Sequence, residues 1–295
     1  MPKTIDTIEL WQDPLSFIFK GVGGTGKSVA MASYGFYGET LHIDLDNKLR
    51  SIATRYRDPK YTKGREFKYE YENFRGNYPG LVNFLEKLLS VKKGEFKYKF
   101  VFADSLTSMA RDIIQLMLDG RPGTNRPGTG GQAGTPYKVL GKVDKPNATM
   151  LFTEKFQGIP IPEIEDYLGE SNGIIQVLDM LQAIRIKHEC HIGLIAHVVR
   201  VEIKNMAGQI IGYDTQLLTA GRKIAAEIPT TWEEQYLFAK KGDMDTRKPP
   251  KFLCRTVDMD DMPASTCLPL PNEFDVTDKV FFDEWHEQAK KAKVA

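Results

Sequence analysis

One eight-residue segment near the beginning of the chain limits its fold more than any other feature. Residues 21–28, which read GVGGTGKS, match the pattern G-x-x-x-x-G-K-[ST] in full. The pattern has a physical role only where a strand ends in a tight turn and a helix follows, because the backbone N–H groups of the turn must point inward. The apolar run at 16–19 and the helical spacing at 27–38 supply that strand and that helix. The sequence therefore predicts an α/β protein with a phosphate-binding loop.

Every position of this loop is predicted to contact a bound triphosphate. The predicted nucleotide-binding residues are Gly21, Val22, Gly23, Gly24, Thr25, Gly26, Lys27 and Ser28. In such loops the lysine neutralises the β- and γ-phosphates and the hydroxyl group binds Mg²⁺. A further Mg²⁺ ligand is needed at the end of a neighbouring strand, and Asp104 directly follows the apolar run at 100–103. The alternative is that Asp104 only caps the next helix.

Further strands and helices alternate along the chain. Apolar spacing predicts strands at 40–45, 97–103, 191–196, 234–238 and 251–257, and helices at 78–92, 105–119, 173–187 and 278–293. This alternation favours a mostly parallel central sheet flanked by helices, with antiparallel strands toward the C-terminal end. We expect a single domain over 1–295, in which 278–295 form a terminal helix and tail.

Composition narrows the class of protein further. Of the 295 residues, 41% are hydrophobic and 27% are charged, which is typical of a folded globular chain. No run approaches the ~20 apolar residues of a membrane span, no secretion signal begins the chain, and three distant cysteines predict no disulfide framework. We therefore expect a cytoplasmic protein without a membrane partner. The 40 Lys and Arg residues nearly balance the 39 Asp and Glu residues, so contacts with DNA must come from local basic segments.

Two strand ends give the chain a resemblance to the RecA-like superfamily of P-loop ATPases. One is the Asp104–Ser105 pair, and the other is the segment IDLD at 43–46. In RecA-like proteins the earlier strand ends in a glutamate that polarises the attacking water, and the matching residue here is Asp46, which is one methylene shorter. The resemblance implies ATP and Mg²⁺ as cofactors, catalytic roles for Lys27, Asp46 and Asp104, and hydrolysis that is slow or stimulated by DNA. The alternative for Asp46 is a solvated turn residue.

The second half of the chain resembles more narrowly the core-only RecA-like ATPases of bacteriophages, which include single-strand annealing recombinases. The segments at 216–229 and 252–256 carry this resemblance. The broader RecA-like resemblance implies that His197, after the strand at 191–196, senses the γ-phosphate; the alternative is a histidine that merely caps the strand. It also implies assembly into a ring or filament with ATP between subunits. The candidate finger residues that reach the neighbouring subunit's ATP are Arg255 and, secondarily, Lys240 and Lys241, and ordinary surface charge is the alternative for all three.

In RecA-like assemblies DNA runs past the loop after the helix that follows Asp104 and past the loop after the sensor strand, so the resemblance implies that two segments contact single-stranded DNA. The first is a mobile, basic, Gly- and Pro-rich loop at 120–147, and the second is a loop at 198–219. Basic, flexible backbone suits contacts with phosphates that do not depend on base sequence, although a solvated linker explains the first loop nearly as well. The predicted DNA-binding residues are Arg121, Arg126, Lys138, Arg200 and Lys204.

These features together predict a Mg²⁺-dependent ATPase that acts on single-stranded DNA in phage recombination or replication. Two alternatives stay open. One is a DNA-translocating motor, either a helicase or a packaging ATPase, although Ser105 stands where packaging ATPases carry a glutamate. The other is a nucleotide-gated assembly protein that does not bind DNA, which the near-neutral net charge allows.

Overall fold

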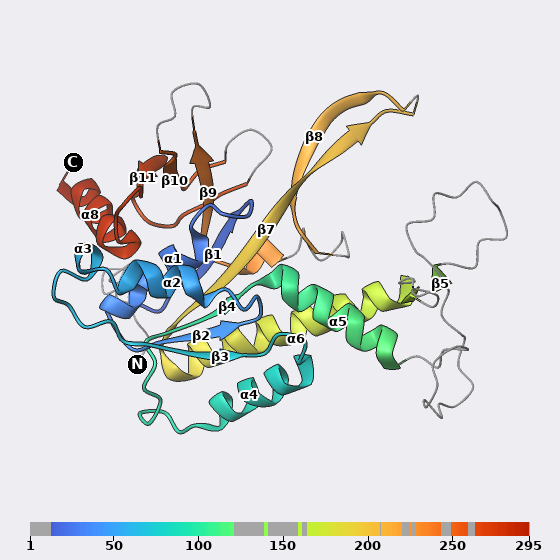
Figure 1. Ribbon diagram of the computed structural model, residues 1–295, viewed down its shortest axis with the longest axis horizontal. Coiled ribbons are helices and arrows are strands. Elements are labelled where there is room, and N and C mark those ends of the chain that lie inside the picture. The colour runs from blue at the N-terminus through green and yellow to red at the C-terminus, as the bar shows by residue number, and fades with distance from the viewer. Residues whose placement is uncertain are drawn as a thin grey trace, which may run out of the picture.

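A mixed sheet forms the centre of the computed structural model. The structure describes residues 13–120, 139–140, 159–160, 164–206, 208–219, 225, 228–242, 249–258 and 263–294. Within these ranges the sheet has nine strands in the order β11-β10-β9-β1-β7-β4-β2-β3, and β8 pairs with β7 beside this path (Figure 1). The predicted fold class, a mostly parallel α/β sheet flanked by helices with antiparallel strands late in the chain, is confirmed at this level.

Six neighbouring strands run parallel to one another. They are β1 (Ser16–Gly21), β2 (Thr40–Asp44), β3 (Tyr69–Asn73), β4 (Phe100–Asp104), β7 (His191–Lys204) and β9 (Glu234–Lys241). The antiparallel strands β10 (Lys251–Arg255) and β11 (Glu273–Asp275) extend the sheet beyond β9. β1, β2 and β4 are buried along their full length, as expected for parallel strands that are covered on both faces.

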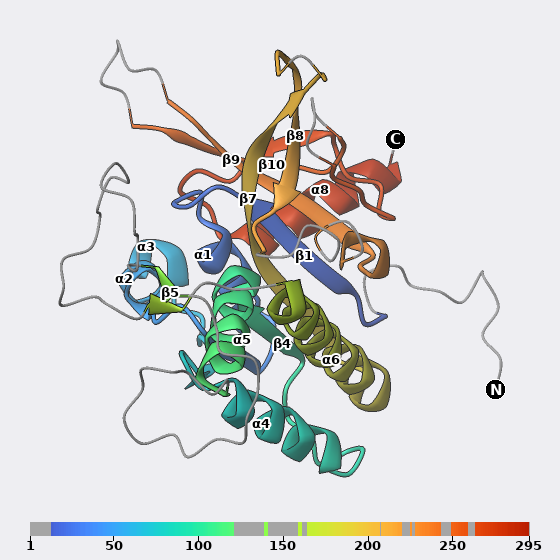
Figure 2. The ribbon, with the colours of Figure 1, turned by 90° about the vertical axis from the view of Figure 1, so that its right-hand side faces the viewer.

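Helices cover both faces of the sheet (Figure 2). An aliphatic core on one face joins the strands to α4 (Tyr78–Ser90), α5 (Leu106–Gly120) and α6 (Ile164–His188). The opposite face carries α1 (Lys27–Ala32), its extension η2 (Ser33–Phe36), α2 (Leu49–Tyr56), α3 (Pro59–Thr62) and α8 (Phe281–Val294). Side chains alternate along each strand, so Phe17 and Phe19 of β1 face α8 while Ile18 faces the aliphatic core.

The longest strand of the sheet, β7, leaves the body of the molecule together with β8 (Ile210–Leu217) as a two-stranded arm (Figure 1). The two strands pair antiparallel from Val198 and Leu217 outward to Lys204 and Ile210. The prediction of a loop at 198–219 is therefore wrong, and Arg200 and Lys204 lie on a β-hairpin. Hydrogen bonds to β8 complete the backbone pairing that β7 loses where it leaves the parallel sheet.

Other segments bear on the remaining predictions. The terminal helix expected from 278 is α8, which begins at Phe281. The predicted basic loop at 120–147 lies outside the described residues, apart from Gly120 and the short strand β5 (Val139–Leu140), which pairs with β6 (Ile159–Pro160). A short 3-10 helix, η4 (Ile228–Thr231), precedes β9. None of the helices in the described ranges has the length and apolarity that crossing a membrane requires.

Candidate functional site

The loop at 21–28 joins β1 to α1, and the backbone requires glycine at two of its positions, 21 and 26. Gly26 has φ 87°, in the left-handed region that favours glycine. A Cβ atom on Gly21 would clash with the backbone oxygen of Phe238. Gly23, Gly24 and Gly26 are exposed, and their amides donate to no acceptor among the residues that the structure describes. The loop therefore offers free N–H groups to an anionic ligand.

Lys27 lies beneath this loop and is almost completely buried. Its ammonium group donates to the backbone oxygens of Gly21 and Val22, both at 2.8 Å, and lies 3.4 Å from the hydroxyl of Thr25. Burial lowers the pKa of Lys27 to about 8, although Asp104 and Asp46 favour the charged form. A ligand phosphate would supply a negative counter-charge directly beside this buried ammonium group.

Strand register brings functional side chains to one edge of the sheet. Gly21 at the end of β1 is paired with His197 of β7, and Asp104 at the end of β4 is paired with Asp44 at the end of β2. Because β7 lies between β1 and β4, His197 stands between the loop and Asp104. Ligands of open parallel sheets bind outside the carboxyl ends of the strands, which is the edge where these residues meet.

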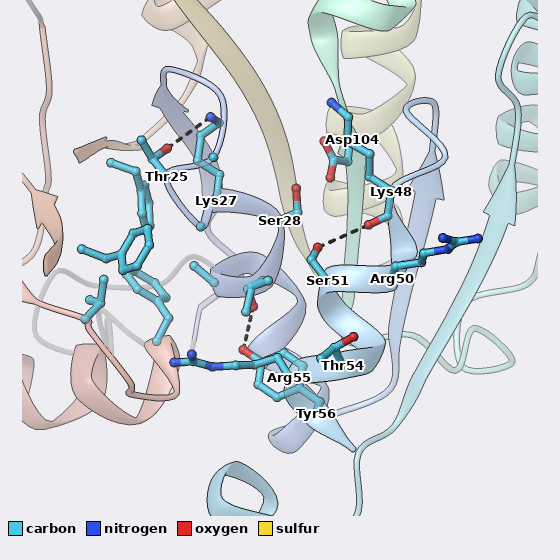
Figure 3. A pocket seen from close by; sticks show the side chains of 18 of the residues that line it. Thr25, Lys27, Ser28, Lys48, Arg50, Ser51, Thr54, Arg55, Tyr56 and Asp104 are labelled. Carbon is cyan, nitrogen blue, oxygen red and sulfur yellow. Dashed lines mark hydrogen bonds between the residues drawn. The ribbon is translucent and has the colours of Figure 1, made fainter. Parts of the chain in front are cut away.

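Asp104 and Ser28 face each other across this edge (Figure 3). Burial raises the pKa of Asp104 to about 6, and a hydrogen bond from Ser28 partly opposes that rise. The next residue, Ser105, caps α5 by accepting a hydrogen bond from the backbone N–H of Ser108 at 3.4 Å. The carboxylate of Asp104 is therefore not needed as the cap of α5, which was the alternative to its role as a Mg²⁺ ligand.

The donor set at this edge fits Mg²⁺ in part. A hydroxyl group and a carboxylate are the hard oxygen ligands that Mg²⁺ prefers, and Mg²⁺ is usually held by one or two such groups together with substrate phosphates and water. In the described part of the chain no three His, Cys, Asp or Glu side chains are grouped as a metal site. Ser28 and Asp104 would therefore hold Mg²⁺ only together with a nucleotide.

Asp46 follows β2 and is held by four neighbours. Its carboxylate accepts hydrogen bonds from Ser105, at 3.2 Å, and from Ser108, and it pairs with Lys48 at 2.7 Å and with Nε2 of His197 at 3.8 Å. Burial alone would raise the pKa of Asp46, but the contacts with His197, Lys48 and Ser108 outweigh it and keep the pKa well below its usual range. Its side chain is only 4% exposed, so the alternative of a solvated turn residue is wrong.

His42 is a buried residue of this site that the sequence did not identify. It lies on β2 two residues before Asp44, its Nδ1 is hydrogen-bonded to the hydroxyl of Tyr69, and its Nε2 lies 3.9 Å from Oδ2 of Asp104. Burial lowers the pKa of His42 to about 3, so the ring is neutral. The only sequence signal was a histidine between two aliphatic residues of a predicted strand, Leu41 and Ile43.

A cavity of about 800 Å³ joins these groups. Lys27, Ser28, Asp46, Asp104 and His197 all line it, and Arg50, Ser51 and Thr54 of α2 form a second wall (Figure 3). A third wall is apolar: Phe238 and Phe252 come from β9 and β10, Val276 directly follows β11, and Phe281 begins α8. The volume lies within the range of small-molecule sites, and the lining combines polar and apolar side chains.

The remaining predicted residues lie elsewhere. Arg255 on β10 is not among the residues that line the cavity, and its Nε donates to Glu273 at 2.6 Å. Lys240 and Lys241 are exposed at the carboxyl end of β9. Arg200 and Lys204 are exposed on the arm. The structure does not describe Arg121, Arg126 and Lys138.

No protein-family profile matches this chain, and no curated protein matches it. The loop, the buried charges and the cavity themselves define the chemistry that this site can support.

Proposed function

We propose that this chain is a RecA-like P-loop ATPase of the core-only phage type, which hydrolyses ATP with Mg²⁺. The meeting of Lys27, Asp46 and Asp104 around one cavity, at the carboxyl edge of a parallel sheet, carries the proposal. The free amides of the loop and the ammonium of Lys27 suit the phosphates, and the apolar wall suits a base. A phenylalanine of that wall, Phe252, lies 3.9 Å from where a Cβ of Gly26 would be.

Each polar residue has a role in this proposal. Ser28 and Asp104 would hold Mg²⁺, which when bound would draw charge from the phosphate oxygens and favour phosphoryl transfer. Asp46 orients the attacking water, and His197, 3.8 Å from Asp46, contacts the water or the γ-phosphate. Because the pKa of Asp46 lies well below its usual range, its carboxylate is a weak general base. This supports slow turnover.

We place single-stranded DNA on the arm formed by β7 and β8. The guanidinium of Arg200 lies 4.0 Å from the ring centroid of Tyr213, and Lys204 adds a second cation on the same hairpin. Aromatic rings that stack on bases, beside cations that contact phosphates, are the elements of binding that does not depend on base sequence. Strand β7 joins this surface directly to His197, so nucleotide state and DNA contact are linked through one strand.

Self-association in a ring or filament, with ATP between subunits, is part of the same proposal. Large apolar side chains on the arm are 37 to 65% exposed, which suits contact with another chain: Val199, Ile203, Ile210 and Ile211. Lys240 and Lys241 extend beyond the end of β1 and suit a finger role, whereas Arg255 would first have to leave Glu273. The same apolar surface also favours the second candidate, a nucleotide-gated assembly protein without DNA binding.

The ATPase proposal is tested with the Lys27→Ala variant. Lys92→Ala is the matched control because Lys92 is exposed on the opposite face of the molecule from α1, next to the end of α4. We expect wild type and Lys92→Ala to bind and hydrolyse ATP, and Lys27→Ala to lose at least about 100-fold in hydrolysis, as when one transition-state donor is removed. Equal hydrolysis by all three proteins, or none by wild type, contradicts the proposal.

The DNA proposal is tested by binding of labelled oligonucleotides at several salt concentrations. Tyr213→Ala removes a ring on the arm that is 42% exposed, and Tyr71→Ala removes a ring on the edge strand β3 that is 54% exposed. We expect only Tyr213→Ala to weaken binding, by about 5- to 100-fold, and binding to fall steeply with salt. Oligomers that depend on ATP without any DNA binding would instead favour the assembly protein, and duplex unwinding would favour the motor.

A further inference from the structure

The side chain of His42 lies directly behind the carboxylate of Asp104, within the sheet. The residue is fully buried, and its ring stacks on Phe102 with a centroid distance of 4.4 Å and an interplanar angle of 13°. Register pairs these two residues across β2 and β4. Stacking on Phe102 therefore fixes the plane of the His42 ring. Both residues lie two positions before the end of their strands, β2 and β4.

The hydrogen bonds of His42 define which of its nitrogens carries the proton. Burial raises the pKa of Tyr69, so its phenol stays protonated and is the natural donor to Nδ1. In a neutral ring that accepts at Nδ1, the proton is on Nε2. The negative charge of Asp104, 3.9 Å from Nε2, favours the same tautomer.

Nε2 of His42 has no hydrogen-bond partner among the described residues, although it is buried. A buried donor left unsatisfied is costly, so such an atom in a functional site calls for a reason. The nearest acceptor is Oδ2 of Asp104, and a movement of about 1 Å would bring the pair to hydrogen-bond distance. His42 is therefore poised to donate to Asp104.

We propose that His42 is a positioning residue for the Mg²⁺ site. Its Nε2–H donates to Oδ2 of Asp104 and sets the orientation of that carboxylate, while Tyr69 holds the ring in the required tautomer. Hydrogen bonds from outer residues to metal-binding carboxylates and imidazoles commonly change metal affinity 10- to 100-fold. The inference rests on the proposed function, because it concerns the metal that would be bound with ATP.

Mn²⁺ is the probe for this inference, and its affinity for the ATP-loaded protein is measured by electron paramagnetic resonance of the free ion. His42→Phe keeps a flat ring against Phe102 but removes both nitrogens. We expect Mn²⁺ affinity to fall 10- to 100-fold, while ATP affinity in EDTA stays within about 2-fold of wild type. The matched control is His188→Phe, because His188 also stacks on a phenylalanine, Phe96, with a centroid distance of 4.0 Å. It should leave Mn²⁺ affinity unchanged.

Two further variants separate positioning from structure. His42→Gln places an amide N–H near the position of Nε2 and should restore most of the Mn²⁺ affinity, whereas His42→Asn places its amide near Nδ1 and should not. This pair carries the test even if His42→Phe does not fold. Equal Mn²⁺ affinity in folded wild-type, Gln and Asn proteins overturns the inference, and so does an equal loss in Gln and Asn.

The outcomes also distinguish the inference from the function beneath it. If wild type binds ATP and Mn²⁺ and the His42 variants do not change metal affinity, the inference alone is overturned. If wild type binds neither ATP in EDTA nor Mn²⁺ with ATP, the proposed function is overturned and the inference with it.

Discussion

At the residue scale, Asp104 carries a charge that its surroundings oppose. Burial raises its pKa to about 6, and the neighbouring carboxylates of Asp46 and Asp44 add to the rise. Asp46 itself is held in the ionised form by His197, Lys48 and Ser108, against its own burial. Opposed shifts at neighbouring carboxylates are typical of functional sites, where stability is given up for chemistry.

This conflict predicts that Asp104→Asn stabilises the protein in the absence of nucleotide and metal. The pKa rises from 3.8 to about 6 on folding, so the stabilisation by protonated Asp104 is complete below pH 4 and is lost as the pH rises through 6. At pH 8 the ionised carboxylate costs at most about 3 kcal/mol, which an amide would not. Urea unfolding of both proteins at pH 5 and pH 8 measures the difference.

The control for this prediction is Asp179→Asn, because Asp179 is exposed on α6. Its free energy of unfolding should match that of wild type at both pH values. The gain from Asp104→Asn should be larger at pH 8 than at pH 5, and it should come with loss of metal-dependent ATP hydrolysis. A gain that does not change with pH would show that the charge of Asp104 is not its cause.

A second prediction concerns the close approach of two backbones at Gly21. A Cβ at this position would clash with the backbone oxygen of Phe238, whereas a Cβ on Gly94 meets nothing within 4 Å. Both glycines have positive φ, so Gly94→Ala controls for backbone strain. We expect Gly21→Ala to lower the free energy of unfolding by roughly 1–3 kcal/mol more than Gly94→Ala does. Equal losses, measured by denaturant unfolding, would contradict the close contact.

The sequence could predict residues whose role is local, but not those whose role depends on register. Lys27 and Ser28 follow from the spacing of one motif, and Asp104 follows from its place after an apolar strand. The contact of His42 with Asp104 exists only because β2 pairs with β4 in one particular register. Nothing in a single strand shows its neighbour's register, so His42 could not be predicted from spacing.

At the element scale, the arm was mispredicted although its pattern was present in the sequence. Val199, Val201 and Ile203 alternate with polar residues, which is typical of a strand. β3 likewise alternates tyrosine and glutamate at 69–72. It was not predicted, because a strand that is buried so little leaves no continuous apolar run in the sequence. The buried strands β1, β2 and β4 were predicted, since continuous apolar runs leave fewer alternatives. Helices α2 and α3 were missed as well.

The arm is predicted to be separable from the folded body. Residues 201–214 replaced by a two-residue Asn-Gly turn would join Arg200 to Thr215, which are already paired across the hairpin. We expect ATP binding to be kept and the free energy of unfolding to change by less than about 1 kcal/mol, because exposed hairpin residues contribute little to the core. Binding of single-stranded DNA should be lost. Loss of ATP binding would show instead that the arm supports the cavity.

At the scale of the whole molecule, the last helix completes a site that the first helix begins. Val276, Lys279 and Phe281, at the entry to α8, line the same cavity as the loop at 21–28. Asp278 fixes this segment by accepting a hydrogen bond from Tyr61 at 2.9 Å and pairing with Arg55 at 3.3 Å. The cavity therefore requires both ends of the described chain.

Nucleotide binding should consequently stabilise α8. We expect ATP to slow amide hydrogen exchange in α8 and in the segment at 276–280, because a ligand that binds only the folded site adds its binding free energy to local stability. α4 lies on the opposite face of the sheet and lines no part of this cavity, so its exchange should change less. Exchange measured by mass spectrometry tests this, and equal protection of α4 and α8 would indicate a global effect instead.

The length of strand β7 has a mechanical consequence for the arm. β7 is one strand from His197, beside the loop, to Lys204 near the tip of the arm, with an irregularity in its pairing only between Ile203 and Lys204. At about 3.3 Å per residue, these seven steps make a lever roughly 23 Å long. A tilt of about 5° at its foot would sweep the far end through about 2 Å. A small rotation of β7 near His197 would therefore produce a larger displacement at the solvent-exposed tip of the hairpin.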